Sequence, residues 1–276
     1  MLVLDSHKRD KLIRWVISNQ SREFGFSFSN LLPPLSSATF YAISILKLLQ
    51  AEIPNRDKNI KYLLDLSNDG SNVYSAYHSA KVLSLFNLSP KNPSDMIKSV
   101  LEQLERWEKI RNRTYYESPL ETVHYSVEIL RLLNCKGLSH KIPEMILKFL
   151  NDDGGFGSGN HSEIETTYFA LASLNSIGYP LKNDLEKTMC FVEKCQNPNH
   201  GFASVPNAYS TFIEDTYYGI KSLSFFGEKI NKPKETLEFV LRCQNSDGGF
   251  SRSESGGIST LENCFYAIHI MNYLSI

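Results

Sequence analysis

Glutamate recurs at one position of a repeated segment, where it could perform acid–base chemistry. The segment runs from this position through two aromatic residues to a small residue and an apolar stretch. In its six copies the first position is held, in order, by Ser37, Ser75, Glu121, Glu165, Glu214 and Glu262. Carboxylates that converge within ~4–6 Å raise one another's pKa and can supply a general acid or bind a hard cation. We predict Glu165, Glu214 and Glu262 as catalytic residues. The sequence does not identify a cofactor, although a site of this kind could bind Mg²⁺.

Two other interpretations of these acids stay open. Acidic side chains in the first turn of a helix are stabilised by the helix dipole, by about 0.3–1 kcal/mol each. The same ring of carboxylates could also form a surface that binds a partner protein.

Aromatic residues and histidines hold the next positions of the segment. Two residues before the small residue stand Phe40, His78, His124, Tyr168, Tyr217 and Phe265. Tyr218 follows directly in the fifth copy. In a generic helical protein such a stripe is core packing, whereas in a closed ring it would line an apolar funnel for a polyisoprenoid tail or a carbocation. The two histidines fit hydrogen-bonded core residues better than ligands, and proton transfer requires that they face each other.

The elements that must position these side chains follow from a repeated loop. Residues 244–250 read QNSDGGF, residues 196–202 read QNPNHGF and residues 151–156 read NDDGGF, with a weaker copy over 20–26. The small residue of the segment recurs every 38 to 49 residues. Such a period is typical of repeat architectures. Six units therefore fill the chain, which we predict to be one domain over residues 1–276.

Each unit is expected to hold two helices. The stretch after each small residue is apolar at helical spacing, and a more charged helix follows it, as over 184–195 and 234–243. Strand-like alternation is missing, so the fold class is all-α. Gly-Gly-Phe turns and terminal units that lack polar caps favour a closed ring over an open stack. The expected fold is an α/α toroid with apolar inner helices and charged outer helices.

Composition excludes several classes of function. The chain has 29 Lys and Arg against 30 Asp and Glu, so it lacks the basic excess of a nucleic-acid binder. Its apolar runs fall short of the ~18 residues that span a bilayer. Five cysteines without a CxxC pair suggest neither a disulfide framework nor a cysteine zinc site. The N-terminus lacks the apolar stretch of a signal peptide, so we expect a cytoplasmic protein.

The loops, their period and the aromatic inner helices resemble the prenyltransferase β-subunit and terpenoid cyclase (squalene cyclase) repeat superfamily. The resemblance covers essentially the whole chain and implies a toroid of six inner and six outer helices. The zinc-binding Asp, Cys and His of prenyltransferases match Phe212, Glu214 and Asn263, so the implied zinc site is not retained and no metal ligands are predicted. Of the basic residues that bind diphosphate, only Arg252 has a counterpart, and the Asp-x-Asp-Asp motif of the cyclases is missing.

The sequence therefore predicts a prenyltransferase- or terpenoid-cyclase-like protein that binds an isoprenoid or similar apolar ligand in a central aromatic cavity. Acid-assisted prenyl or terpenoid chemistry is favoured. The alternatives are a non-catalytic toroid that binds a protein partner or a lipid, and a β-subunit-like chain that needs an α-helical partner. The predicted substrate-binding residues are Phe40, His78, His124, Tyr168, Tyr217, Tyr218, Arg252 and Phe265.

Overall fold

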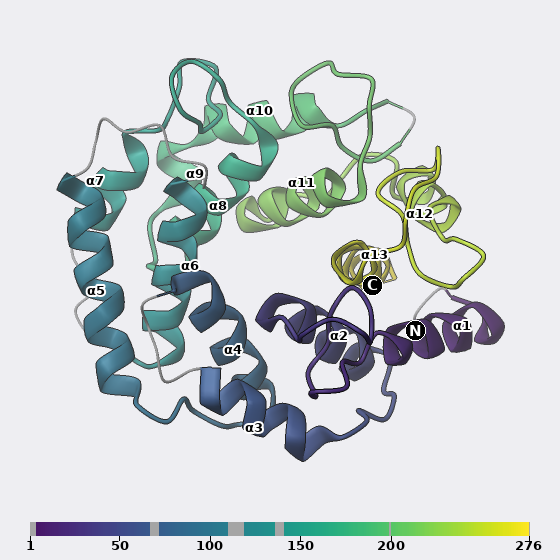
Figure 1. The fold of residues 1–276 in the computed structure, drawn as a ribbon. Helices are drawn as coiled ribbons and strands as arrows, with labels where there is room; N and C mark the ends of the chain where they lie inside the picture. The colour runs from purple at the N-terminus through teal and green to yellow at the C-terminus, as the bar shows by residue number, and fades with distance from the viewer. Residues whose placement is uncertain (1–3, 67–71, 110–118, 136–140, 199, 276) are drawn as a thin grey trace.

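The computed structural model describes residues 4–66, 72–109, 119–135, 141–198 and 200–275, and these residues form thirteen helices and no sheet (Figure 1). The inner ring consists of α2 (Ser36–Leu48), α4 (Val73–Leu85), α6 (Pro119–Leu132), α8 (Ile164–Ser176), α11 (Ile213–Phe226) and α13 (Leu261–Leu274). The outer ring consists of α1 (Ser6–Ser18), α3 (Arg56–Leu66), α5 (Pro93–Lys109), α7 (Lys141–Leu147), α10 (Glu186–Cys195) and α12 (Pro233–Arg242). A short helix, α9 (Leu181–Asp184), precedes α10.

The two rings close. Each inner helix packs against the next, and α13 packs against α2, so the first and last units are neighbours. On the outside, the loop of the last unit lies against α1. There the side-chain amide of Gln244 donates to the Lys8 carbonyl at 3.4 Å, and a Cβ on Gly248 would collide with Lys11. The prediction of an all-α toroid with a closed ring is therefore confirmed.

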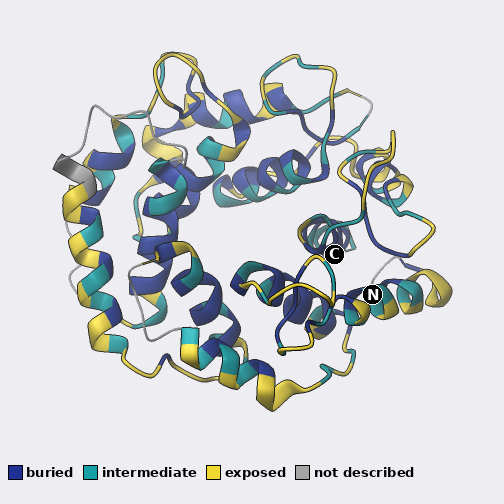
Figure 2. Cartoon of the chain, in the orientation of Figure 1, coloured by how far each residue is buried: buried dark blue, intermediate teal, exposed yellow. Residues whose placement is uncertain are grey.

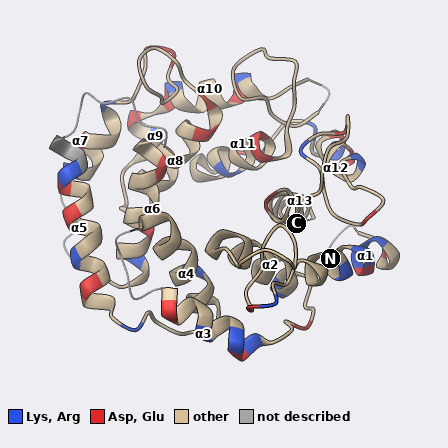
Figure 3. Ribbon diagram, in the orientation of Figure 1, with Lys and Arg blue, Asp and Glu red and all other residues tan. Residues whose placement is uncertain are grey.

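Burial follows the division into two rings. The inner helices are buried on most of their surface, whereas the outer helices bury one face and expose the other (Figure 2). Charged residues accordingly gather on the outer helices and loops (Figure 3). This is the pattern expected when one amphipathic layer covers an apolar one. Among the described helices, every one is too short or too polar to cross a membrane.

The repeated loops anchor the start of four inner helices. Their phenylalanines are fully buried: Phe26, Phe156, Phe202 and Phe250. The backbone N–H of each phenylalanine donates to a side chain on the inner helix that follows. The acceptors, in chain order, are Oγ1 of Thr39 (2.9 Å), Thr167 (2.9 Å) and Thr216 (3.0 Å) and Sγ of Cys264 (3.2 Å). The small residue of the segment lies three positions after this acceptor and leaves space for the phenylalanine ring. In the fifth copy, a Cβ on Gly219 would overlap the ring of Phe202.

The register predicted for the second copy of the segment is wrong by one residue. Tyr77, not His78, takes the position two before the small residue, because Tyr77 stacks on Tyr125 of the next inner helix with ring centroids 4.4 Å apart, as the tyrosines of later copies do. Ser79 and Ala80 are both small and buried, so either one could fit the small position by residue type. Only the packing of α4 against α6 distinguishes them.

Candidate functional site

A cavity of about 750 Å³ lies inside the ring of inner helices. Its walls include residues from the last turns of these helices, among them Lys47, Leu85, Arg131, Ser176 and Phe225. The inner helices run in parallel, so the cavity lies toward their C-terminal ends. Ligand pockets of soluble proteins commonly have volumes of ~300–1,000 Å³.

Aromatic rings form the deeper wall of the cavity. Seven of the eight residues predicted to bind substrate line it: Phe40, His78, His124, Tyr168, Tyr217, Tyr218 and Phe265. Rings on neighbouring inner helices touch around the barrel, with centroids 5.2 Å apart for Phe40 and Phe265 and 5.9 Å apart for Tyr168 and Tyr217. Between α4 and α6 the ring that contacts His124 is Tyr77, at 6.0 Å, and not His78. Arg252, the eighth, is not among the lining residues.

A polar layer lies one helical turn beyond the aromatic residues. It holds one residue from each inner helix, and all six line the cavity: Ser44, Lys81, Glu128, Ala172, Lys221 and His269. Ala172 is the one apolar member. Sequence reasoning missed this layer. The available signal was its spacing: each member follows its aromatic residue by four positions, which places both on one face of a helix.

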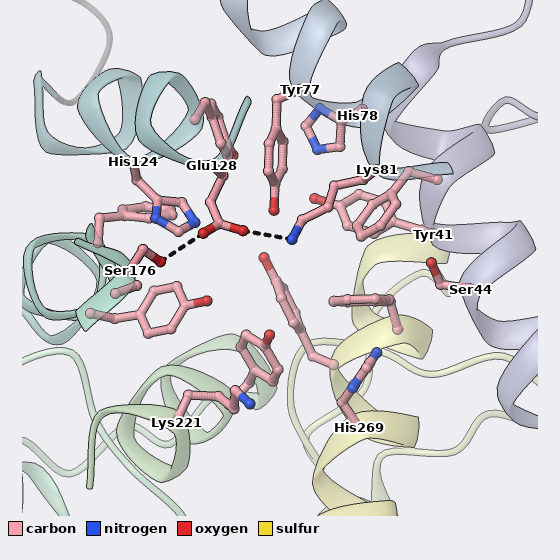
Figure 4. Close-up of a pocket in the computed structure, with 18 of the residues that line it drawn as sticks. Tyr41, Ser44, Tyr77, His78, Lys81, His124, Glu128, Ser176, Lys221 and His269 are labelled. Atoms are coloured by element: carbon pink, nitrogen blue, oxygen red, sulfur yellow. Dashed lines mark hydrogen bonds and ion pairs between the residues drawn. The ribbon is translucent and has the colours of Figure 1, made fainter. Parts of the chain in front are cut away.

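Glu128 is the centre of a hydrogen-bonded network in this layer (Figure 4). Its buried carboxylate accepts from Nζ of Lys81 at 2.7 Å, from Nε and an Nη of Arg131 at 3.1 and 3.2 Å, and from Oγ of Ser176 at 2.7 Å. Burial alone would raise the pKa of Glu128, but the bonds from Arg131, Lys81 and Ser176 outweigh it and hold the pKa below its usual value. The network ties α4, α6 and α8 together and keeps Glu128 ionised.

The histidines of the cavity are neutral near pH 7. Burial lowers the pKa of His78 and of His124 to about 4, and burial together with the charge of Lys221 does the same for His269. Nδ1 of His78 donates to the Tyr74 carbonyl at 2.8 Å, as expected for a core histidine. Nδ1 of His124 is buried without a hydrogen-bond partner among the described residues.

The opposite end of the barrel carries an acidic mouth, formed by glutamates at the starts of the inner helices. Glu262 accepts from the hydroxyls of Tyr41 at 2.8 Å and Tyr266 at 3.0 Å. The Tyr266 hydroxyl lies 2.9 Å from that of Tyr218, which reaches Glu165 at 3.2 Å. The structure thus links two of the predicted catalytic acids through two tyrosines. A separate pair joins the carboxylate of Glu121 to the hydroxyl of Tyr125 at 2.6 Å.

Two carboxyl groups near this mouth have pKa values well above the usual range. Loss of hydration and the like charge of Glu121 raise the pKa of Glu165 to about 7, against the opposing effect of the Tyr218 hydroxyl. Burial and the neighbouring Glu214 raise the pKa of Asp215 to about 7 as well. Glu165, Glu214 and Glu262 are absent from the lining of the large cavity. The tyrosines that bind Glu165 and Glu262 line it, and they therefore stand between the acids and the cavity.

The third predicted acid, Glu214, has a different setting. It forms an ion pair with Arg252, whose guanidinium also lies over the ring of Phe212, 3.9 Å from the centroid. Burial raises the pKa of Glu214, and Arg252 opposes the rise. Arg252 therefore binds Glu214 at the acidic mouth and does not line the cavity, as its predicted role in ligand binding would require.

The positions that match the zinc ligands of prenyltransferases do not fit a zinc ion. Phe212 has no donor atom and is covered by Arg252, and Glu214 is occupied by the same arginine. Asn263 supplies an amide where zinc would need an imidazole. Within the described ranges, no group of three or more His, Cys, Asp or Glu side chains is arranged to hold a metal ion.

Comparison with known proteins agrees with this architecture. The family model of the prenyltransferase alpha-alpha toroid domain matches residues 1–80, 67–208 and 102–275, whereas no curated protein matches the chain. Among solved structures, Candida albicans protein geranylgeranyltransferase-I complexed with GGPP is similar, with a TM-score of 0.65 and 13% identity over 95% of this chain and 90% of that one. At this identity the likeness concerns the fold. The resemblance inferred from the repeated loops is confirmed, and the chain belongs to the prenyltransferase alpha-alpha toroid domain family.

Proposed function

We propose that this protein binds an isoprenoid or a similarly long apolar ligand in the central cavity. The observation that carries the proposal is the wall of touching aromatic rings around a space of about 750 Å³. Burying apolar ligand surface against such a wall is worth roughly 25 cal/mol per Å². The rings also present π faces, which attract any positive charge on the ligand.

The family context supports the same class of ligand. The similar solved structure is a protein geranylgeranyltransferase-I complexed with GGPP, an isoprenoid diphosphate. The present chain keeps the aromatic barrel, while Phe212 and Asn263 replace zinc ligands. Binding of the apolar chain is therefore the part of the family's chemistry that these residues support best.

The test is native mass spectrometry with farnesol, farnesyl diphosphate and geranylgeranyl diphosphate, with and without Mg²⁺ or Zn²⁺. The variant Ala172→Phe places a ring in the cavity and should abolish binding, because Ala172 is the smallest member of the polar layer. Leu101→Phe, on the partly exposed surface of α5, is the matched control and should bind as the wild type does. Failure of all ligands to bind, or equal binding by both variants, would refute the proposal.

Acid-assisted prenyl or terpenoid chemistry is a second candidate, favoured by a proton count at the acidic mouth. Glu165, Tyr218, Tyr266 and Glu262 are joined by three oxygen–oxygen contacts, yet the two tyrosines supply only two hydroxyl hydrogens. A proton on Glu165 completes the chain, and the raised pKa of this carboxyl is consistent with it. Because Tyr218 stands between Glu165 and the cavity, the proton would pass to an alkene carbon through the Tyr218 hydroxyl, which takes the proton of Glu165 in return. The carbocation formed beside the aromatic rings would then lose a proton from a neighbouring carbon and restore an alkene.

This chemistry predicts that deuterium from D₂O enters an isoprenoid incubated with the protein. Glu165→Gln and Glu262→Gln should each abolish the incorporation, while Glu102→Gln, on the exposed surface of α5, should retain it. Tight ligand binding without deuterium incorporation would leave the binding function and remove the catalytic one. The geometry supports binding more strongly, since none of the three acids lines the cavity.

A further inference from the structure

Two lysines in the polar layer differ from the other basic residues around the cavity. Lys47 and Arg131 stand in the last turns of α2 and α6, where cations offset the helix dipole. Lys81 and Lys221 stand more than three residues before the ends of α4 and α11, so the dipole does not account for them. Lys81 has a partner, because it donates to the carboxylate of Glu128 at 2.7 Å.

The ammonium of Lys221 has no hydrogen bond or ion pair within the described part of the chain. It is half-buried, and its neighbours in the layer are Ala172 and His269, neither of which carries a negative charge. Burial and the charge of Lys81 lower the pKa of Lys221. In Figure 4, Lys221 and His269 lie across the cavity from the paired Lys81 and Glu128. An unpaired, partly desolvated ammonium is unfavourable unless an anion meets it.

We infer that Lys221 binds the singly charged anionic head of a long apolar ligand, a carboxylate, in the space beside Ala172. This inference rests on the proposed function, since the tail of the same ligand would lie against the aromatic wall. A single charge fits because Glu128 already compensates Lys81, and neutral His269 adds no charge. The other two cations lie at the rim, in the last turns of α2 and α6, and each has a partner. Arg131 bonds to Glu128, and Lys47 donates to the Leu85 carbonyl.

The spacing along the helices suits such an amphiphile. Lys221 follows Tyr217 by four residues, which places the head about 6 Å along the helix from the aromatic layer. Lys221 lies closer to the C-terminal ends of the inner helices than the aromatic residues do, and the cavity reaches the last turns of these helices. Ala172, the smallest residue of the layer, leaves room for the head between Glu128 and Lys221. The ligand would therefore enter tail first and keep its carboxylate near the opening.

The experiment compares three probes that share one tail: farnesoic acid, farnesol and farnesyl diphosphate. Dissociation constants are measured by titration calorimetry for the wild type, Lys221→Met and the rim control Lys47→Met. A charge-assisted bond to Lys221 should make the acid bind about ten- to a hundredfold more tightly than the alcohol. Lys221→Met should remove this preference and leave the Kd of farnesol unchanged within about twofold, whereas Lys47→Met should keep the preference.

Each other outcome counts against the inference. Equal affinity for the acid and the alcohol, or a preference that survives Lys221→Met, would overturn the role of Lys221. Binding of the diphosphate more than about tenfold tighter than the acid would overturn the single-charge head. In all three cases farnesol still binds, and the proposed function stands. If none of the probes binds, the proposed function fails and this inference falls with it.

Discussion

The network around Glu128 makes a sharp prediction about stability. Replacing Glu128 with Gln keeps the size of the side chain and the bond from Ser176, but it removes the charge that faces Lys81 and Arg131. Removing one partner of a buried ion pair costs ~3–5 kcal/mol. Half of the Arg131 side chain is exposed, so the ion pair between Arg131 and Glu128 should contribute ~0–1 kcal/mol to stability, as surface ion pairs do. We therefore expect Glu128→Gln to lower the free energy of unfolding at pH 7 by about 2–4 kcal/mol.

Urea denaturation followed by circular dichroism measures this loss, and Glu102→Gln is the matched control. Glu102 pairs with Arg106 on the exposed surface of α5 at 3.4 Å, so its replacement should cost less than about 0.5 kcal/mol. A loss below about 0.5 kcal/mol for Glu128→Gln as well would refute the reasoning, because the buried pair would then behave as a surface one.

The same variant carries a pH signature with a defined sign. The pKa of Glu128 is lower in the folded protein than its usual value, so the folded state binds fewer protons than the unfolded one in that window. Its contribution is fully present above the usual glutamate pKa and is lost as the pH falls toward the lowered one. The difference in stability between wild type and Glu128→Gln should therefore shrink on acidification. A difference that stays constant down to the acid limit of folding would contradict the assignment.

Three further predictions test the loops and the acidic mouth. Gly219→Ala should destabilise the fold by about 1–3 kcal/mol in urea denaturation, because the new Cβ overlaps the buried ring of Phe202. Thr216→Val should cost about 1–3 kcal/mol in the same assay, since the N–H of Phe202 loses its acceptor, and no change would refute the anchoring role. The raised pKa of Glu165 means that the folded state holds this proton more tightly, so wild-type stability should fall as the pH rises from about 4.5 to about 7. Glu165→Gln should reduce this fall, and Asp215, whose pKa is also raised to about 7, should account for the part that remains. Carboxyl ¹³C NMR on Glu121→Gln should show a lower pKa for Glu165, because a like charge has been removed.

The sequence predicted the positions of the anchoring loops and the aromatic wall well, for a local reason. A loop phenylalanine such as Phe250 and a small residue such as Gly219 recur in the sequence at a nearly fixed period. They recur because in each unit with such a loop the ring packs against the small residue of the inner helix. Cys264 shows how local chemistry varies within that scheme. It replaces the threonine of sister copies, and its Sγ accepts the same backbone bond at 3.2 Å.

The polar layer escaped prediction because its members are related in space and not by residue type. Lys81 and Glu128 lie 47 residues apart and meet only because α4 and α6 are neighbours in the ring. The one-residue error at His78 and Tyr77 has the same origin. Residue type allowed either register, and the stacking of Tyr77 on Tyr125 selects one.

The sequence by itself determined the fold class, the closure of the ring and half of the aromatic and histidine side chains that line the cavity, because the same local contacts recur in every unit. The tertiary structure alone decided that the cavity of about 750 Å³ lies beyond the aromatic layer, toward the ends of the inner helices. Glutamates at the helix starts suggested a funnel below an acidic mouth, but the carboxylates of Glu165 and Glu262 bond to tyrosine hydroxyls that stand between them and the cavity. The cavity lies on the other side of those rings, toward the helix ends, where Glu128 and Lys221 face it. Side chains from all six inner helices meet there, and their combined volume and charge depend on the closed ring.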